Sequence, residues 1–296
     1  MIRTVLVPLD GSEPSESVLP YAEQIAGRTG SEVVLLTAVY LASAWGSWPK
    51  AASAQAYLES KRDQLKSRGL RARTVMAYQP AAEAILNSAA DEDADLIAMS
   101  THRRSGMTHW ISWSVADKVL HATHRPLLLV RATEPEGRQE APAIRKILAP
   151  LDGSPHAESV LPFVVGLAKA LDASLELFHA VPTVELHPCV EVARLPTPEL
   201  LNRLEAQTNE LLARVVKDVQ KEGVKARGIF TIGLAVNEIV NAAEREGEGL
   251  IAMATHGRSG TGRWMIGSVA DAVIRRTDLP CLVVRPQEVQ EAQRND

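Results

Sequence analysis

An internal repeat is the feature of this sequence that most constrains its fold. The segment ValProLeuAspGlySer at 7–12 returns as AlaProLeuAspGlySer at 149–154, and GluSerValLeuPro at 16–20 returns unchanged at 158–162. Both pairs of segments are 142 residues apart in a chain of 296 residues. The repeat therefore predicts two domains that share one fold, each of ordinary domain size.

The spacing of the repeat is longer toward the end of each half. SerValAlaAsp occurs at 114–117 and again at 268–271, 154 residues later, so the second half contains 12 additional residues. We place these residues around 182–198, which is predicted to form a long loop or a lid.

A polar stretch separates the two halves. Residues 132–143 are rich in Pro and Glu and have no apolar periodicity, which is typical of a linker. We predict a first domain over 1–132, a linker over 133–143 and a second domain over 144–296.

Within each half, apolar runs of strand length alternate with amphipathic segments of helix length. This alternation predicts an α/β fold with right-handed crossovers, in which each half forms a doubly wound parallel sheet of five strands with helices on both faces. In the first half, helices are expected near 15–29, 51–68, 81–91 and 114–124. Strands are expected at 4–9, 32–39, 70–77, 96–100 and 127–130, and in the second half at 146–151, 174–181, 225–231, 250–254 and 281–285.

Composition and charge argue against several classes of function. The formal net charge of -4 and the lack of a long basic run argue against nucleic-acid binding. No run of about 20 apolar residues could span a membrane, and no signal-peptide pattern opens the sequence, so we expect a cytoplasmic protein. Cys189 and Cys281 are the two cysteines, and both are expected to be free thiols.

The segment 255–271, which follows a predicted strand, is the strongest candidate for a binding element. Its glycines are Gly257, Gly260, Gly262 and Gly267. Glycines allow positive φ and a close approach of the backbone, so successive amides can surround an anion. Ser268 is placed at the start of a helix, where free amides and the helix dipole favour negative charge. The sequence therefore predicts a polyphosphate at this position.

The glycine spacing resembles that of universal stress proteins that bind ATP, which show Gly, two residues, Gly, nine residues, then Gly followed by Ser or Thr. Ala254, Gly257, Gly267 and Ser268 fall on these positions, with Ala254 in place of the first Gly. The resemblance implies a tandem universal stress protein with a Rossmann-like, adenine nucleotide α-hydrolase-like fold. It also implies a regulatory, stress-response role, ATP as the ligand with or without Mg²⁺, and pairing of the two halves about a pseudo-twofold axis through their last strands.

The resemblance also implies roles for individual residues. Asp152 would contact the ribose or the adenine edge, Val181 would offer backbone groups to the base, and 257–268 would surround the phosphates. An aspartate suits sugar hydroxyls because it only accepts hydrogen bonds, but AspGlySer is also good turn chemistry, so a turn role for Asp152 remains an alternative. The candidate ATP-binding residues of the second domain are Pro150, Asp152, Val181, Met253, Ala254, His256, Gly257, Arg258, Gly267, Ser268 and Val269.

The first half departs from the ATP-binding pattern. Its corresponding positions are Ser100, Arg103, Trp113 and Ser114. Side chains at 103 and 113 should obstruct the approach of the backbone to a phosphate, so weak or absent ATP binding is expected there. Its candidate residues are Asp10, Arg103 and Ser114. Alternatively, Arg103 and Arg104 hold a different anion through their guanidinium groups.

Neither a catalytic residue nor a metal site is predicted. His121 and His124 have helical spacing but no accompanying carboxylate cluster, and His102 and His256 are expected to be loop histidines or phosphate contacts. A Walker motif and a serine nucleophile elbow are absent, so at most weak ATP hydrolysis is expected. A slow ATPase, a nucleotide-free scaffold or carrier of another small ligand, and a homodimer of the whole chain remain open alternatives.

Overall fold

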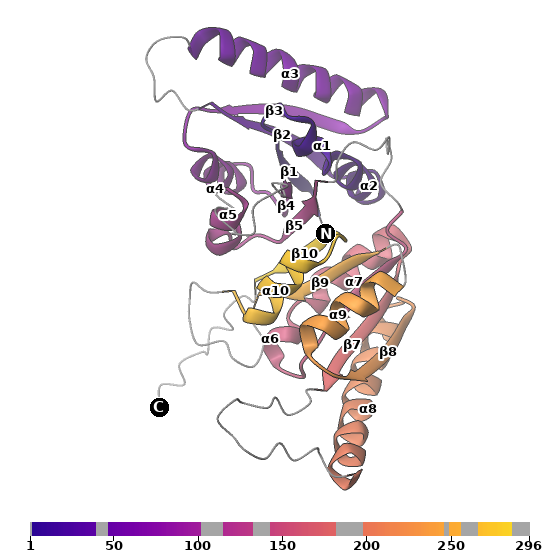
Figure 1. Cartoon of the computed structure of the whole chain (residues 1–296). Coiled ribbons are helices and arrows are strands. Elements are labelled where there is room, and N and C mark those ends of the chain that lie inside the picture. Colours follow the sequence, from indigo (N-terminus) through magenta and orange to yellow (C-terminus); the bar gives the residue numbers. More distant parts are fainter. Residues whose placement is uncertain are drawn as a thin grey trace, which may run out of the picture.

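The computed structural model describes residues 2–39, 47–101, 115–132, 143–181, 198–245, 249–255 and 266–285 (Figure 1). The strands of the first half are β1 (Thr4–Pro8), β2 (Glu32–Ala38), β3 (Arg71–Ala77), β4 (Leu96–Thr101) and β5 (Leu127–Arg131). Those of the second half are β6 (Lys146–Pro150), β7 (Ser174–Val181), β8 (Ala226–Ile232), β9 (Leu250–Ala254) and β10 (Cys281–Val284). All ten expected strands are present, and none of their ends differs from the predicted end by more than one residue.

Helices connect these strands in both halves. Those of the first half are α1 (Glu13–Glu16), α2 (Leu19–Thr29), α3 (Ser47–Ser67), α4 (Ala81–Asp91) and α5 (Ala116–Ala122). Those of the second half are α6 (Pro155–Glu158), α7 (Leu161–Leu171), α8 (Pro198–Lys221), α9 (Ala235–Arg245) and α10 (Ser268–Arg276).

The prediction of one helix over 15–29 was wrong, because the chain forms α1 and α2 with a break at Ser17 and Val18. Pro20 lies in the first turn of α2. Proline has no amide hydrogen and is tolerated where a helix begins, because the amides of the first turn have no partner within the helix.

One continuous sheet of ten strands runs through both halves, in the order β3-β2-β1-β4-β5-β10-β9-β6-β7-β8. Strands within each half pair in parallel, whereas β5 and β10 pair antiparallel, with Cys281 opposite Leu129. The two parallel sheets of five strands that the sequence predicts are therefore joined edge to edge through their last strands. Figure 1 shows the junction of β5 and β10 in the middle of the molecule, and α3 and α8 at opposite ends of the molecule.

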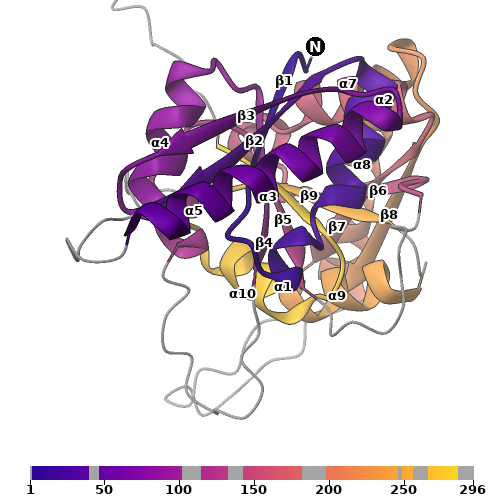
Figure 2. The same ribbon diagram turned by 90° about the horizontal axis from the view of Figure 1, so that it is seen from above.

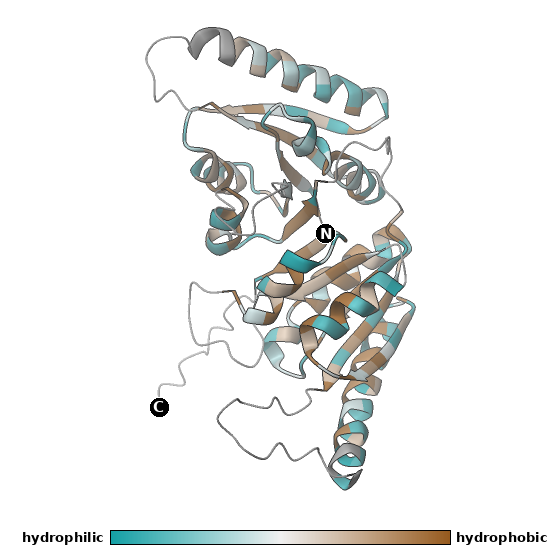
Figure 3. Ribbon diagram, viewed as in Figure 1, coloured by the Kyte–Doolittle hydropathy of each residue, from teal (hydrophilic) through white to brown (hydrophobic). Residues whose placement is uncertain are grey.

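The helices cover both faces of the sheet. Buried side chains of α2, α3, α7 and α8 belong to one apolar core, and those of α4, α5, α9 and α10 belong to the other. Figure 2 looks down on the first half with α3 in front, and Figure 3 shows apolar strands between helices that have polar outer surfaces. The strand sequence LeuIleAlaMet in β4 and in β9 is buried along its whole length, as expected for a strand covered on both sides.

Contacts outside the sheet also join the halves. Helices α2 and α7 pack against each other, and the amide of Ile144 donates a hydrogen bond of 2.9 Å to the side chain of Gln24. Of the predicted linker 133–143, only residue 143 is among the described residues. None of the helices in the part of the chain that the structure describes has the length and apolar character needed to cross a membrane.

Candidate functional site

The candidate site of the second half lies where β6 and β9 end. These two strands are parallel neighbours, with Ile147 opposite Leu250. The strand that follows β6 in the chain, β7, pairs with the other side of β6. Their carboxyl ends, Pro150 and Ala254, therefore lie side by side at the point where the connections diverge to opposite sides of the sheet. This is the place where open parallel sheets bind ligands.

Asp152 follows β6 and organises a tight turn. Its Oδ1 atom accepts hydrogen bonds from the amide of Ser154 at 2.9 Å and from the hydroxyl of Ser154 at 2.6 Å. Ser154 in turn caps α6, because its hydroxyl oxygen accepts a hydrogen bond of 3.1 Å from the amide of Ala157. Gly153 has a φ of 80°, a conformation that favours glycine. The turn role that AspGlySer predicts is therefore present, and because a carboxylate has about four acceptor positions, it does not rule out a ligand.

Asp10 makes the same turn in the first half. Its Oδ1 atom accepts hydrogen bonds from the amide and the hydroxyl of Ser12, at 2.9 and 2.5 Å. Asp10 is exposed and Asp152 is half-buried. The two aspartates thus have equal structural roles, and any difference in ligand binding must come from their surroundings.

Val181 ends β7, the strand next to β6. Its side chain is buried, and its carbonyl oxygen accepts a hydrogen bond of 3.0 Å from the amide of Gly233. This carbonyl, a predicted contact to the base, is thus already engaged with the connection that follows β8. Ile232 and Leu234 flank Gly233 and are exposed apolar side chains that the sequence reasoning missed. Their position at the end of β8 and just after it was the signal that could have pointed to them.

Helix α10 begins beside the end of β9, and its first turn is open to solvent. The amide of Gly267 donates a hydrogen bond of 2.7 Å to the carbonyl oxygen of Thr255, so the two ends of the intervening segment meet. Gly267 is the N-cap of α10 and Ser268 is its first residue, as expected. Ser268 and Val269 are exposed, and Val269 keeps 39% of its surface, so the amino end of α10 presents a hydroxyl and an apolar side chain.

Gly267 does not adopt the positive φ that glycine allows. Its φ is -60° and its ψ is 142°, an extended conformation that any residue can adopt. What glycine provides here is the absence of a side chain at the entrance to α10. The effect of a substitution at 267 therefore depends on steric obstruction and not on backbone strain.

The remaining predicted residues of the second site fall into two groups. Pro150 is half-buried, whereas Met253 and Ala254 are buried, and Met253 is part of the core shared with α9 and α10. Met253 can thus form at most the floor of a site. The other candidates of the second half, those of the first half that follow β4, and Cys189 lie outside the described residues: His102, Arg103, Arg104, Trp113, Ser114, Cys189, His256, Gly257, Arg258, Gly260 and Gly262.

The segment predicted as a long loop lies between β7 and α8. Residues 182–197 separate these two elements, whereas 39–46 separate β2 from α3, so eight of the 12 additional residues fall here. This segment too lies outside the described residues.

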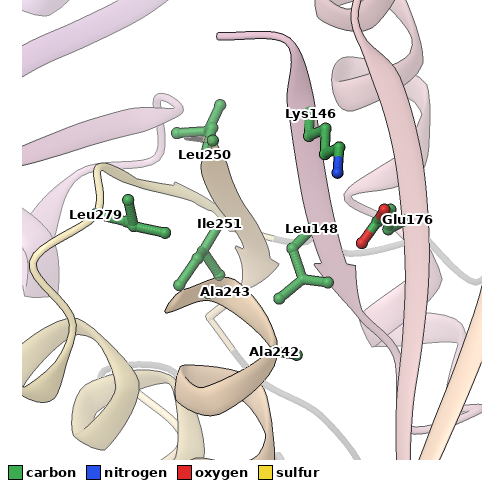
Figure 4. Close-up of a pocket in the computed structure, with 9 residues that line it drawn as sticks. Lys146, Leu148, Glu176, Ala242, Ala243, Leu250, Ile251 and Leu279 are labelled. Carbon is green, nitrogen blue, oxygen red and sulfur yellow. The ribbon is translucent and has the colours of Figure 1, made fainter. Parts of the chain in front are cut away.

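A small pocket lies at the opposite edge of the sheet, at the amino ends of β6 and β9 (Figure 4). Its walls include Lys146, Leu148, Glu176 and Leu250, and its cavity volume is about 20 Å³. A volume of this size holds a water molecule and is too small for a nucleotide. Glu176, buried at this edge, forms an ion pair with Arg227 of the neighbouring strand β8. This pocket is therefore not the candidate site.

No metal centre is found in the described ranges. They contain no group of three or more His, Cys, Asp or Glu side chains that could hold a metal ion. His121 is half-buried, and its Nδ1 atom lies 2.8 Å from the carbonyl oxygen of Asp117, within its own helix.

Comparison with known proteins gives one family model and several similar proteins. The model of the universal stress protein family matches residues 1–131 and 143–285. Universal stress protein MJ0531 of Methanocaldococcus jannaschii is 34% identical over 142 residues, covering 48% of this chain and 82% of that protein. Universal stress protein YxiE of Bacillus subtilis is 31% identical over 145 residues, covering 47% of this chain and 98% of that protein. The crystal structure of a universal stress protein from Archaeoglobus fulgidus DSM 4304 has a TM-score of 0.70 at 19% identity, covers 96% of this chain and 97% of that chain, and shows the same fold.

Proposed function

This chain belongs to the universal stress protein family, and from that premise we propose that it is a regulatory nucleotide-binding module that binds ATP in its second domain. The observation that carries the proposal is the meeting of three elements at one edge of the sheet. They are the Asp152 turn after β6, the buried end of β9, and the exposed amino end of α10. They meet at the carboxyl ends of the strands, where open parallel sheets bind their ligands.

Each element suits a different part of ATP. The Asp152 carboxylate accepts hydrogen bonds, which suits the ribose hydroxyls and would repel phosphates. The first amides of α10 have no partner within the helix and lie at the positive end of its dipole, which suits the phosphates. Val269 adds an exposed apolar side chain at this end of the helix. Charge alone therefore orients the nucleotide, with its sugar toward β6 and its phosphates toward α10.

The first domain is proposed to bind ATP weakly or not at all. Its fold and its Asp10 turn match those of the second domain, so the scaffold offers no reason for the difference. The reason lies in the sequence, where Arg103 and Trp113 replace two glycines of the ATP-binding pattern. A side chain at these positions occupies the space that the backbone would need to reach a phosphate.

We further propose that ATP acts as a signal and not as a substrate for rapid turnover. The nucleotide pattern comes without a Walker lysine or a general base, so any hydrolysis should be slow. Measurement of phosphate release over hours tests this point. Release at more than about 1 per second, the lower end of ordinary enzyme turnover, would instead make the chain an ATPase.

Substitution of Gly267 by tryptophan tests the location of the site. This change copies the residue at the corresponding position of the first domain, and we expect it to abolish ATP binding in equilibrium dialysis. The matched control is Gly166→Trp on α7, a helix on the opposite face of the sheet. Gly166 suits this purpose because it is exposed and a Cβ atom there has no neighbour within 4 Å. Loss of ATP in both variants, or in neither, would contradict a site at the amino end of α10.

A further inference from the structure

The two arginines that end the last strands are related by the repeat. Arg131 ends β5 and Arg285 directly follows β10, and they are 154 residues apart, as are His121 and Arg275. Arg131 donates a hydrogen bond of 2.5 Å to the carbonyl oxygen of Arg275, near the end of α10. Arg285 donates the equivalent bond, of 2.7 Å, to the carbonyl oxygen of His121 near the end of α5. Each domain thus caps the last helix of the other.

The two caps are unequal. Arg131 also forms an ion pair of 2.6 Å with Asp278 and lies 3.5 Å from the carbonyl oxygen of Ile274, and only 13% of its side chain is exposed. At the position corresponding to Asp278 the first half has His124, which supplies no carboxylate. The Nε and Nη1 atoms of Arg285 are buried and have no hydrogen-bond partner among the residues of the structure's described part. The cap on α10 is therefore the complete one.

The capped helix is the one whose amino end forms the candidate phosphate site. The last carbonyl groups of a helix have no partner within the helix, and a cation there also interacts favourably with the helix dipole. The carbonyl of Val273 is satisfied by the amide of Thr277, and Arg131 satisfies the next two, those of Ile274 and Arg275. At nine residues, α10 is only about 14 Å long, so a tilt at its carboxyl end displaces its amino end.

We propose that Arg131 is a positioning residue for the nucleotide site of the second domain, so that the first domain sets the affinity for ATP without holding ATP itself. This inference rests on the proposed function. The proposed role of Arg131 gives the first domain, whose glycine pattern is altered, a function in ATP binding by the second domain, whose pattern is nearly intact. By reciprocity, ATP bound at α10 strengthens the contact between the domains.

Titration of paired variants with ATP tests this inference. Removal of the cap by Arg131→Met should weaken ATP binding about three- to tenfold, the range expected for loss of a charged helix cap. The matched control Arg285→Met removes the equivalent cap from α5 and should change the dissociation constant by less than about twofold, while both variants lose stability. Arg131→Lys keeps the charge without the planar fork and should recover part of the affinity.

The outcomes separate the inference from the proposed function. If the native chain does not bind ATP, both are wrong. If the native chain binds ATP and Arg131→Met binds it equally well, only the inference is wrong, and the same holds if Arg285→Met weakens binding as much as Arg131→Met. Should Arg131→Met fail to fold, hydrogen exchange of the native chain decides, because ATP should slow exchange in β5 of the first domain, and unchanged exchange there overturns the inference.

Discussion

Replacement of Asp152 by alanine separates the two roles that this residue can have, and Asp10→Ala is its internal control. Each substitution removes two hydrogen bonds that an aspartate Oδ1 atom accepts from the serine two residues later, at 2.9 and 2.6 Å in the second domain and at 2.9 and 2.5 Å in the first. Both turns are partly exposed, so each loss should cost about 1 to 2 kcal/mol of unfolding free energy. The structural cost is thus expected to be the same in the two halves.

The effect on ATP should be different in the two halves. A hydrogen bond from a ribose hydroxyl to a carboxylate contributes about 1.5 to 3 kcal/mol, so Asp152→Ala should weaken ATP binding roughly 10- to 100-fold. Asp10→Ala should leave the affinity unchanged, and so should Ser154→Ala, which removes the cap of α6 and one hydrogen bond to Asp152 but keeps the Asp152 carboxylate. Urea unfolding measures the structural cost and calorimetry measures the affinity. Equal loss of affinity in Asp10→Ala and Asp152→Ala, or no loss in either, would refute the assignment of Asp152 to the ligand.

Further predictions concern packing and pH. Gly228→Ala on β8 should lower the unfolding free energy by about 1 to 3 kcal/mol, because the new Cβ atom would lie 2.9 Å from the Cβ atom of Leu212. Gly166→Ala should raise the unfolding free energy by about 0.5 to 1 kcal/mol, because Gly166 lies within α7 and a Cβ atom there has no neighbour within 4 Å. Denaturation curves that shift in the same direction for both variants would contradict this packing. Phe178→Ala should lower the unfolding free energy by about 3 to 5 kcal/mol in the same assay, because the Phe178 side chain is fully buried. A loss below about 1 kcal/mol would contradict this burial. Burial raises the pKa of the Cys281 thiol to about 12, above its value in the unfolded chain, so its contribution to stability is present below about pH 9 and is lost as the pH rises toward 12. Between pH 8 and pH 10, the unfolding free energy of the native chain should therefore fall by about 1 kcal/mol more than that of Cys281→Val. Parallel pH profiles of the unfolding free energy for the two proteins would contradict the burial of this thiol.

The positions of the strands were predictable because burial on both faces leaves a continuous apolar run in the sequence. LeuIleAlaMet marks β4 and β9 in this way, and the repeat then doubles the evidence. The helix ends were less predictable. The break at Ser17 and Val18 lies just before Pro20, which favours the start of a helix, and α3 begins at Ser47, four residues before its expected start.

The local structure of the candidate site was largely predictable, and its longer-range contacts were not. The AspGlySer turn and the start of α10 at Ser268 follow from local chemistry and were confirmed. The conformation of Gly267 was not predictable from residue type, since glycine also adopts ordinary dihedral angles. The bond between Arg131 and Arg275 joins residues 144 positions apart and depends on the antiparallel pairing of β5 with β10, so no local pattern could reveal it.

The most direct test of this account is the number of ATP molecules that one chain binds. The measurement is a calorimetric titration of nucleotide-stripped native protein with ATP, in the presence and absence of Mg²⁺. The account predicts one ATP per chain. Two per chain would show that the first domain retains a working site despite Arg103 and Trp113, and no binding at all would contradict the proposed function.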